Sequence, residues 1–267
     1  MVGQKNNLMK MKTLVEQNKV PHFIIVSGPE LSGKGTLIKE FCEIIDKNAN
    51  IVNIIANMES MRNMIDDVPI EKTIYIIENF ESLRIDAQNS VLKLFEEPRD
   101  NCYYIISTIN EDIMLPTILS RGQIFRMEHY SLAELKVFAE NNIASEFLFT
   151  ICESPSEIIY WKNRDIEAFK QFIDNFYKDL TTKSIPYSIN DLTNIGYKVE
   201  QVEPYYLYFI RSLSNKIVRT YNWKTRYQYV AFMKLVDDLY KSTKYVGVRK
   251  ESLMEIFIIN LHNLLNK

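Results

Sequence analysis

The feature that most restricts the fold is the string GPELSGKGT at Gly28–Thr36. It follows the apolar run Phe23–Val26 and leads into a helical pattern over Thr36–Ile45. In a loop of this kind, backbone N–H groups and the lysine hold phosphate oxygens, and the start of the helix adds the positive end of its dipole. The order strand, phosphate-binding loop (P-loop), helix predicts an α/β domain.

Further short β-rich runs alternate with helical patterns along the first half of the chain. They are Ile51–Ile55, Ile74–Ile77, Tyr103–Ile106 and Ile124–Met127. Strands that alternate with helices form a parallel sheet covered on both faces. The clearest helical pattern is Ala87–Glu97, with Asp86 as its N-cap and Pro98 after its end. Its apolar stripe consists of Ala87, Val91, Leu94 and Phe95.

After Tyr130 the β-rich runs stop and helical periodicity takes over. We therefore expect an α/β domain over residues 1–130, a small helical lid over 131–180 and an all-α bundle over 181–267, with the polar stretch Thr181–Gly196 as the connection. Three apolar stripes predict the long helices of this half. They are Ile166, Phe169, Ile173, Phe176 and Leu180; Tyr206, Ile210, Leu213 and Ile217; and Tyr229, Met233, Val236 and Tyr240.

Charge and cysteine content exclude several classes of protein. Lys and Arg number 32 against 34 Asp and Glu, so the chain has no excess positive charge with which to bind nucleic acid nonspecifically. Cys42, Cys102 and Cys152 are odd in number and widely spaced, which argues against disulfides and zinc modules. No apolar run reaches the length of a membrane span. We expect a cytoplasmic protein.

An apolar strand ending in acidic residues normally accompanies a P-loop, because a carboxylate must hold the metal ion and polarise water. Here Ile74–Ile77 is followed by Glu78 and Asn79. Glu78 can orient a metal-bound water, but the amide of Asn79 cannot act as a general base. In the loop, Gly35 occupies the position of the usual Ser or Thr and removes a magnesium-binding hydroxyl, although Thr36 offers one nearby.

Several motifs together resemble the AAA+ domain of bacterial clamp-loader subunits, and within that family the delta-prime subunits of DNA polymerase III. The resemblance covers Asn18 to Arg126, roughly half of the chain. The segments that carry it are Asn18–Gly28, Ile77–Leu83, Ala87–Pro98, Ser107–Thr108 and Leu115–Arg121. It implies an AAA+ P-loop domain, a helical lid and a C-terminal collar bundle that assembles with other subunits.

The resemblance also implies roles for individual residues. Arg121 matches the arginine of the family's Ser-Arg-Cys motif, which reaches into the ATP site of a neighbouring subunit as an arginine finger; the alternative is a surface arginine paired with an acid. Gly122 replaces the cysteine of that motif. Thr108 matches the sensor of the γ phosphate, and the alternative is an ordinary threonine at the end of a strand. The candidate nucleotide-binding residues are Gly28, Ser32, Gly33, Lys34, Gly35, Thr36, Glu78 and Thr108.

Departures from the family argue against ATP hydrolysis by this chain. The lid of an active subunit carries Gly-Ser-Pro-Gly and a basic sensor, whereas this chain has Glu153–Glu157, and Glu157 would repel phosphate. Gly35 and Asn79 depart in the same direction. The family's zinc-binding cysteines are absent, so we expect no zinc and no other metal bound by protein residues alone. The sequence leaves open whether ATP and Mg²⁺ bind.

The resulting hypothesis is a stator subunit that works with the gamma/tau and delta subunits to place the sliding clamp on primed DNA. Two other classes stay open. The chain is an active ATPase, either a gamma/tau-type motor subunit or a small nucleotide kinase, whose loops share Gly-Lys-Gly-Thr; or it is a scaffold that binds no nucleotide. A kinase needs several arginines around the transferred phosphate, and no such cluster is evident in the sequence.

Overall fold

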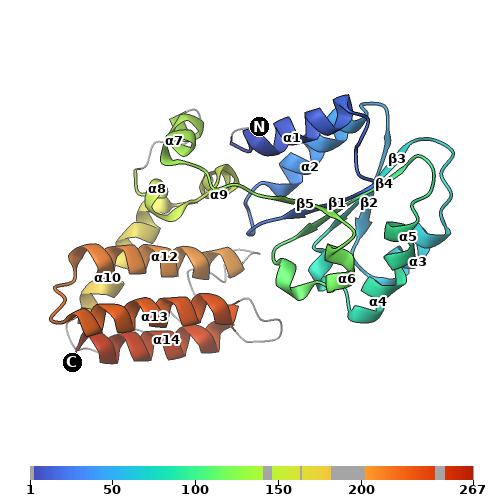
Figure 1. Cartoon of the computed structure of the whole chain (residues 1–267). Helices are drawn as coiled ribbons and strands as arrows, with labels where there is room; N and C mark the ends of the chain where they lie inside the picture. The colour runs from blue at the N-terminus through green and yellow to red at the C-terminus, as the bar shows by residue number, and fades with distance from the viewer. Residues whose placement is uncertain (1–2, 141–145, 163, 182–201, 244–249, 267) are drawn as a thin grey trace. The chain divides into compact units, whose positions relative to one another are not determined.

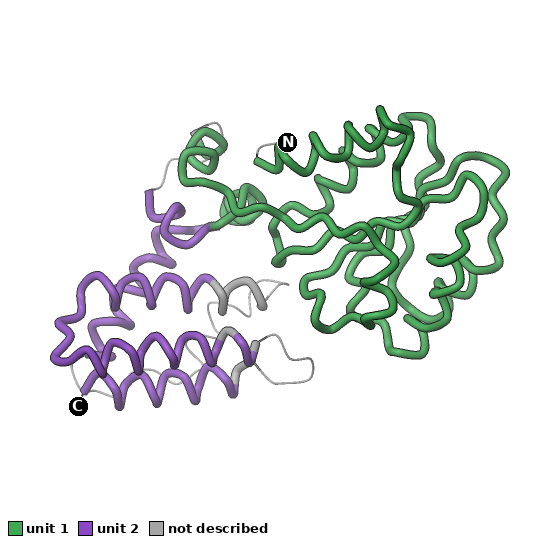
Figure 2. The backbone as a smooth tube through the Cα atoms, in the orientation of Figure 1, with its two compact units in different colours: residues 1–143, 153–162 green, residues 144–152, 163–267 purple. Residues whose placement is uncertain are grey.

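The computed structural model describes residues 3–140, 146–162, 164–181, 202–243 and 250–266. The chain divides into two compact units (Figure 2): unit 1 holds residues 1–143 and 153–162, and unit 2 holds residues 144–152 and 163–267. Neither unit begins or ends at residue 130, because the first helix after the sheet stays with unit 1. The expected connection at 181–196 falls almost wholly outside the described residues. The division into three domains therefore stays a prediction.

Unit 1 is built on a five-stranded sheet in the order β2-β3-β4-β1-β5, with all neighbouring strands parallel. The strands are β1 (Phe23–Ser27), β2 (Asn50–Ile55), β3 (Thr73–Glu78), β4 (Cys102–Thr108) and β5 (Gln123–Arg126). Every residue of β1 is buried, as a strand covered on both faces requires. The five β-rich runs predicted from the sequence are confirmed.

Helices cover the two faces of this sheet (Figure 1). On one face α1 and α2 enclose a core that includes Met11, Leu37 and Phe41; on the other, the helices from α3 to α6 enclose one that includes Met61 and Phe95. The helical segments of unit 1 are α1 (Lys5–Glu16), α2 (Lys34–Ile45), α3 (Met58–Asp66), η1 (Phe80–Ser82), α4 (Ile85–Ser90), α5 (Leu92–Glu96), η2 (Glu111–Ile113), α6 (Pro116–Leu119), α7 (Leu132–Glu140) and α9 (Pro155–Trp161).

The helix expected over Ala87–Glu97 is two helices, α4 and α5, separated at Val91. The Ser90 hydroxyl donates to the Ala87 carbonyl at 2.7 Å, a local bond that competes with the helical ladder. The expected N-cap was also wrong: α4 begins after Arg84, and Asp86 lies in its first turn. The predicted apolar stripe is confirmed, since all four of its residues are buried.

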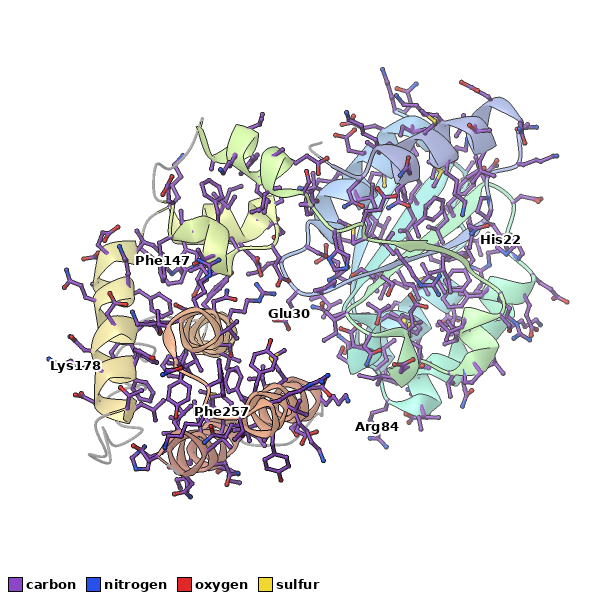
Figure 3. The ribbon with its side chains drawn as sticks, turned by 60° about the vertical axis from the view of Figure 1, so that its left-hand side comes forward. His22, Glu30, Arg84, Phe147, Lys178 and Phe257 are labelled. Atoms are coloured by element: carbon purple, nitrogen blue, oxygen red, sulfur yellow. The ribbon has the colours of Figure 1, made fainter. Side chains whose placement is uncertain are left out.

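The described residues of unit 2 are mainly helical. The helices among them are α8 (Leu148–Ile151), α10 (Ile166–Thr181), α12 (Val202–Thr220), α13 (Arg226–Thr243) and α14 (Lys250–Leu265). In α10, Phe169, Ile173, Phe176 and Leu180 are buried as predicted, and so are Ile210, Leu213 and Ile217 in α12. Figure 3 shows Lys178 pointing away from the bundle. The side chains of Tyr206 and Tyr240 lie outside the described residues.

The stripe predicted for α13 was wrong. Tyr229 and Met233 are 37% and 45% exposed, whereas Phe232 and Leu239 are buried. Aromatic and aliphatic residues occur on several sides of this helix, so two apolar stripes offset by about one residue both fit the helical spacing. Helix α13 packs against α14, and the stripe that includes Phe232 and Leu239 is the buried one. Within the described ranges, none of the helices combines the length and the apolar character that crossing a bilayer requires.

Candidate functional site

The P-loop joins the C-terminal end of β1 to the start of α2, as the sequence predicts. Gly33 is the N-cap of α2 with φ 90°, a conformation that favours glycine. Neither a side-chain cap nor an acidic residue is present in the first turn of α2. The first N–H groups of a helix have no partner within it, so this end is suited to an anion. Figure 3 labels Glu30, which lies in the loop.

Lys34 is folded back onto its own loop. Its amino group donates to the carbonyls of Gly28 and Pro29, both at 2.8 Å. Burial lowers the pKa of Lys34, an effect opposed by the nearby carboxylates of Glu81, Glu30 and Glu78. A phosphate would therefore have to displace two carbonyl oxygens from this ammonium group, in a setting that already disfavours its charge.

Side chains from two later segments hold the outer side of the loop. The Tyr130 hydroxyl donates to the Ser32 carbonyl at 3.1 Å, and the Ser154 hydroxyl donates to the Leu31 carbonyl at 2.5 Å. Leu31 has φ 55°, which is costly for a branched side chain. The Ser32 hydroxyl oxygen is buried and has no hydrogen-bond partner among the described residues. Its hydrogen-bonding capacity is therefore unused by these residues.

Ser154 was not predicted as a site residue. It is the N-cap of α9, and its oxygen also accepts from the Glu157 N–H at 3.2 Å. The Glu157 carboxylate, only 2% exposed, accepts in turn from the Glu153 N–H. Ser-Pro-Ser-Glu is a capping-box pattern with proline at the first helical position, and this signal in the sequence was available. The carboxylate expected to repel phosphate thus has a structural role at the start of α9.

The acidic end of β3 lies beside the start of α2. A Cβ atom added at Gly35 would lie 3.6 Å from Glu78 Oε1, an ordinary van der Waals contact, so space alone does not exclude a serine there. Glu78 and Asn79 are exposed. Asn79 has φ 55°, and its backbone N–H donates to Ser107 Oγ at 3.3 Å. The turn therefore fixes the backbone of Asn79 and leaves its amide side chain in solvent.

Thr108 ends β4 next to the P-loop, and its carbonyl accepts from the Gly28 N–H at 3.1 Å. Its side chain is fully buried. The hydroxyl donates to the Asn110 carbonyl at 3.0 Å and accepts from the Asn110 N–H at 3.2 Å. Because a hydroxyl has one proton, this local bond must break before Thr108 can donate to a phosphate. Its sensor role stays a prediction.

A cavity of about 390 Å³ lies at the C-terminal ends of β2 and β3. Asn53, Ile55, Glu78 and Asn79 are among its lining residues. It opens where the outer strand β2 is covered on one face only, so that Ile55 is 77% exposed. In the part of the chain that the structure describes, no three His, Cys, Asp or Glu side chains gather as a set of metal ligands.

Arg121 lies at the N-terminal ends of the strands, whereas the P-loop lies at their C-terminal ends. It precedes β5, whose residue Gln123 pairs with Ile24 near the start of β1, whereas the P-loop follows the end of β1 at Ser27. The four residue steps from Phe23 to Ser27 span about 13 Å at roughly 3.3 Å each. In Figure 3, His22, before β1, and Glu30, after it, lie well apart. Arg121 therefore cannot reach the P-loop of its own chain.

Three groups of the same chain hold the Arg121 side chain, one of them the Ser120 hydroxyl, which accepts from Nη1 at 3.4 Å. One guanidinium nitrogen, Nη1, donates to the Thr117 carbonyl, and the other, Nη2, forms an ion pair with Glu96. The side chain is 30% exposed. The alternative weighed from the sequence, an arginine paired with an acid of its own chain, describes this state. The glycine that follows, Gly122, packs directly against Ile25.

Comparison with known proteins relates the chain to replication proteins. A family model described as DNA polymerase III, delta subunit, matches residues 42–131. The chain is 24% identical over 189 residues to DNA polymerase III subunit tau of Bacillus subtilis, covering 59% of this chain and 33% of that protein. It is 35% identical over 83 residues to an uncharacterized protein, MG007 homolog, of Mycoplasma pneumoniae, covering 31% of this chain and 33% of that protein. Each match thus spans about a third of the curated relative.

Among solved structures, the chain is similar to a DNA polymerase III, gamma subunit-related protein from Thermotoga maritima. The TM-score is 0.53 at 16% identity, over 97% of this chain and 99% of that one. At this identity the likeness shows the fold alone, an AAA+ type of P-loop fold. Together with the matches in sequence, it supports an AAA+ protein of the clamp-loader type.

Proposed function

We propose that this chain is a delta-prime-like subunit of a DNA polymerase III clamp loader, which supplies Arg121 to the ATP site of a neighbouring subunit. Its partners would be the gamma/tau and delta subunits, the sliding clamp and, through the assembled complex, primed DNA. The support for this class of partner is the family match over residues 42–131 and the similarity to a tau subunit. A complex of this kind acts in the cytoplasm.

The position of Arg121 is the observation that carries the proposal. It lies on a loop at the end of the sheet opposite to its own P-loop, with 30% of its side chain exposed. An arginine placed there can stabilise phosphate charge only in another chain. An arginine finger supplied by a neighbour is worth on the order of 10³ to 10⁵ in rate.

We further propose that the P-loop holds nucleotide without hydrolysing it. Bound ATP would supply the phosphates for which the N-terminus of α2, the Ser32 hydroxyl and Lys34 are suited. Magnesium fits less well, because Gly35 has no side-chain oxygen, which leaves the carboxylate of Glu78 next to it as the metal ligand. Asn79, with an amide in place of a carboxylate, leaves water without a base.

The test is to replace Arg121 by alanine in the reconstituted complex and measure its DNA-dependent ATPase. We expect the turnover of the site that faces Arg121 to fall by about 10³ or more. Arg126→Ala is the matched control, because Arg126 belongs to the adjacent β5, is exposed and pairs with Glu111 at 2.6 Å. Unchanged turnover with Arg121→Ala in an intact complex contradicts the finger role.

The other two classes predict different results for the isolated chain. ATP hydrolysis by the purified protein, or transfer of phosphate to a nucleoside monophosphate, would indicate an active enzyme. No binding of a fluorescent ATP analogue would indicate a scaffold. We expect binding that Lys34→Ala weakens, and no turnover, because the loop offers phosphate ligands while position 79 offers no base.

A further inference from the structure

Two of the three guanidinium nitrogens of Arg121 are already engaged within its own chain. Nη1 donates to the carbonyl of Thr117 in α6, and Nη2 pairs with the carboxylate of Glu96 at the end of α5. The third nitrogen, Nε, is buried and has no hydrogen-bond partner among the described residues. The two terminal nitrogens are therefore the ones that can reach another molecule, and each already has at least one partner within the chain.

Glu96 is the partner that an incoming anion can replace. The Thr117 carbonyl belongs to the backbone of α6 and cannot leave. The Glu96 side chain, in contrast, is 45% exposed and can rotate into water. Ion pairs that are this exposed are weak, and a phosphate carries more charge than one carboxylate. While Glu96 stays in place, its charge also repels a phosphate that approaches the same guanidinium group.

We propose that Glu96 is a competitor for Arg121: it holds the guanidinium group in the free chain and gives way to the phosphate of a neighbouring subunit on assembly. This inference rests on the finger role proposed above. Glu96 is then a positioning residue, which sets how readily Arg121 engages the neighbour and takes no part in the chemistry itself. The exchange makes the stimulation of the neighbour depend on assembly.

The test compares single and double variants in the reconstituted complex at limiting concentrations of this chain. Glu96→Gln keeps the shape and removes the charge, so we expect the ATPase that depends on Arg121 to rise by a few fold, up to about fivefold for an exposed pair. Glu97→Gln is the matched control, because Glu97 is the neighbour of Glu96, is also exposed, and loses the same charge. It is expected to leave the ATPase unchanged.

The Arg121→Ala background separates competition from a general effect on folding or assembly. There, Glu96→Gln should change nothing, and thermal melting should show that every variant is folded. If Arg121→Ala lowers the ATPase but Glu96→Gln leaves it unchanged or lowers it, competition is wrong and the finger role stands. If Arg121→Ala itself has no effect, the finger role fails and the competition falls with it.

Discussion

Gly122 occupies a position where a single methyl group does not fit. A Cβ atom added there would lie 2.5 Å from both Cγ1 and Cδ1 of Ile25 and 3.0 Å from Cε1 of Phe23. Both neighbours are fully buried in the core beneath the sheet. The φ of Gly122 is not positive, so the backbone itself accepts alanine. The steric contact with Ile25 and Phe23 is therefore the only source of the expected destabilisation. Overpacking of this kind costs about 1 to 3 kcal/mol, and we expect Gly122→Ala to lower the unfolding free energy by that amount.

The two contacted atoms of Ile25 allow a graded test. Ile25→Val removes Cδ1 but keeps a carbon at Cγ1, whereas Ile25→Ala removes both. On their own these changes cost about 0.5 to 1.5 and about 2 to 5 kcal/mol, because they open space in the core. In the double variants, Ile25→Ala should cancel the penalty of the methyl group added by Gly122→Ala, and Ile25→Val should cancel only part of that penalty.

Equilibrium urea unfolding of the single and double variants measures these couplings. The reasoning would be refuted if Gly122→Ala cost the same in all three backgrounds, since the penalty would then not arise from Ile25. The result also bears on Arg121, the preceding residue. The clamp-loader motif carries cysteine after its arginine, and a side chain of that size requires a smaller residue at position 25 in this chain.

Two further predictions concern single side chains. Burial raises the pKa of the Cys42 thiol to about 11, from 9.0. At pH 8 the thiolate fraction of Cys42 is then about 0.1% in place of about 10%. Iodoacetamide should therefore alkylate Cys42 about 100-fold more slowly in the folded chain than in urea, as measured by mass spectrometry. Equal rates in the two conditions would contradict the shift in pKa. Ser154→Ala should lower the unfolding free energy by about 1 to 2 kcal/mol through loss of the α9 cap, while Ser156→Ala in the same helix should have little effect on urea unfolding.

The sheet was predictable because its strands are short apolar runs separated by helical patterns. Phe23–Val26 and Ile74–Ile77 have no polar residue that would suit a solvated face, which is the pattern of strands buried on both sides. The P-loop was predictable for a different reason: its glycines and lysine are required by the contact with phosphate, so the motif is almost independent of the rest of the fold.

The failures have physical causes that periodicity does not record. The helix over Ala87–Glu97 is interrupted at Val91, next to the bond from the Ser90 hydroxyl to the Ala87 carbonyl, although the apolar spacing continues through the break. On α13, Phe232 contacts Trp223 and is buried, whereas Met233 is exposed. The bonds from Tyr130 and Ser154 to the P-loop connect residues about 100 positions or more apart in the chain, and no local pattern shows them.

The way in which Lys34 bonds to its own loop affects how its variants are interpreted. Its two hydrogen bonds, to the carbonyls of Gly28 and Pro29, link two parts of the loop. A Lys34→Ala protein is therefore not equivalent to the natural protein without its ligand, because it also lacks an internal brace. Weak binding by such a variant reports on a loosened loop as well as on a missing charge, and a neutral side chain of similar length is the cleaner reference.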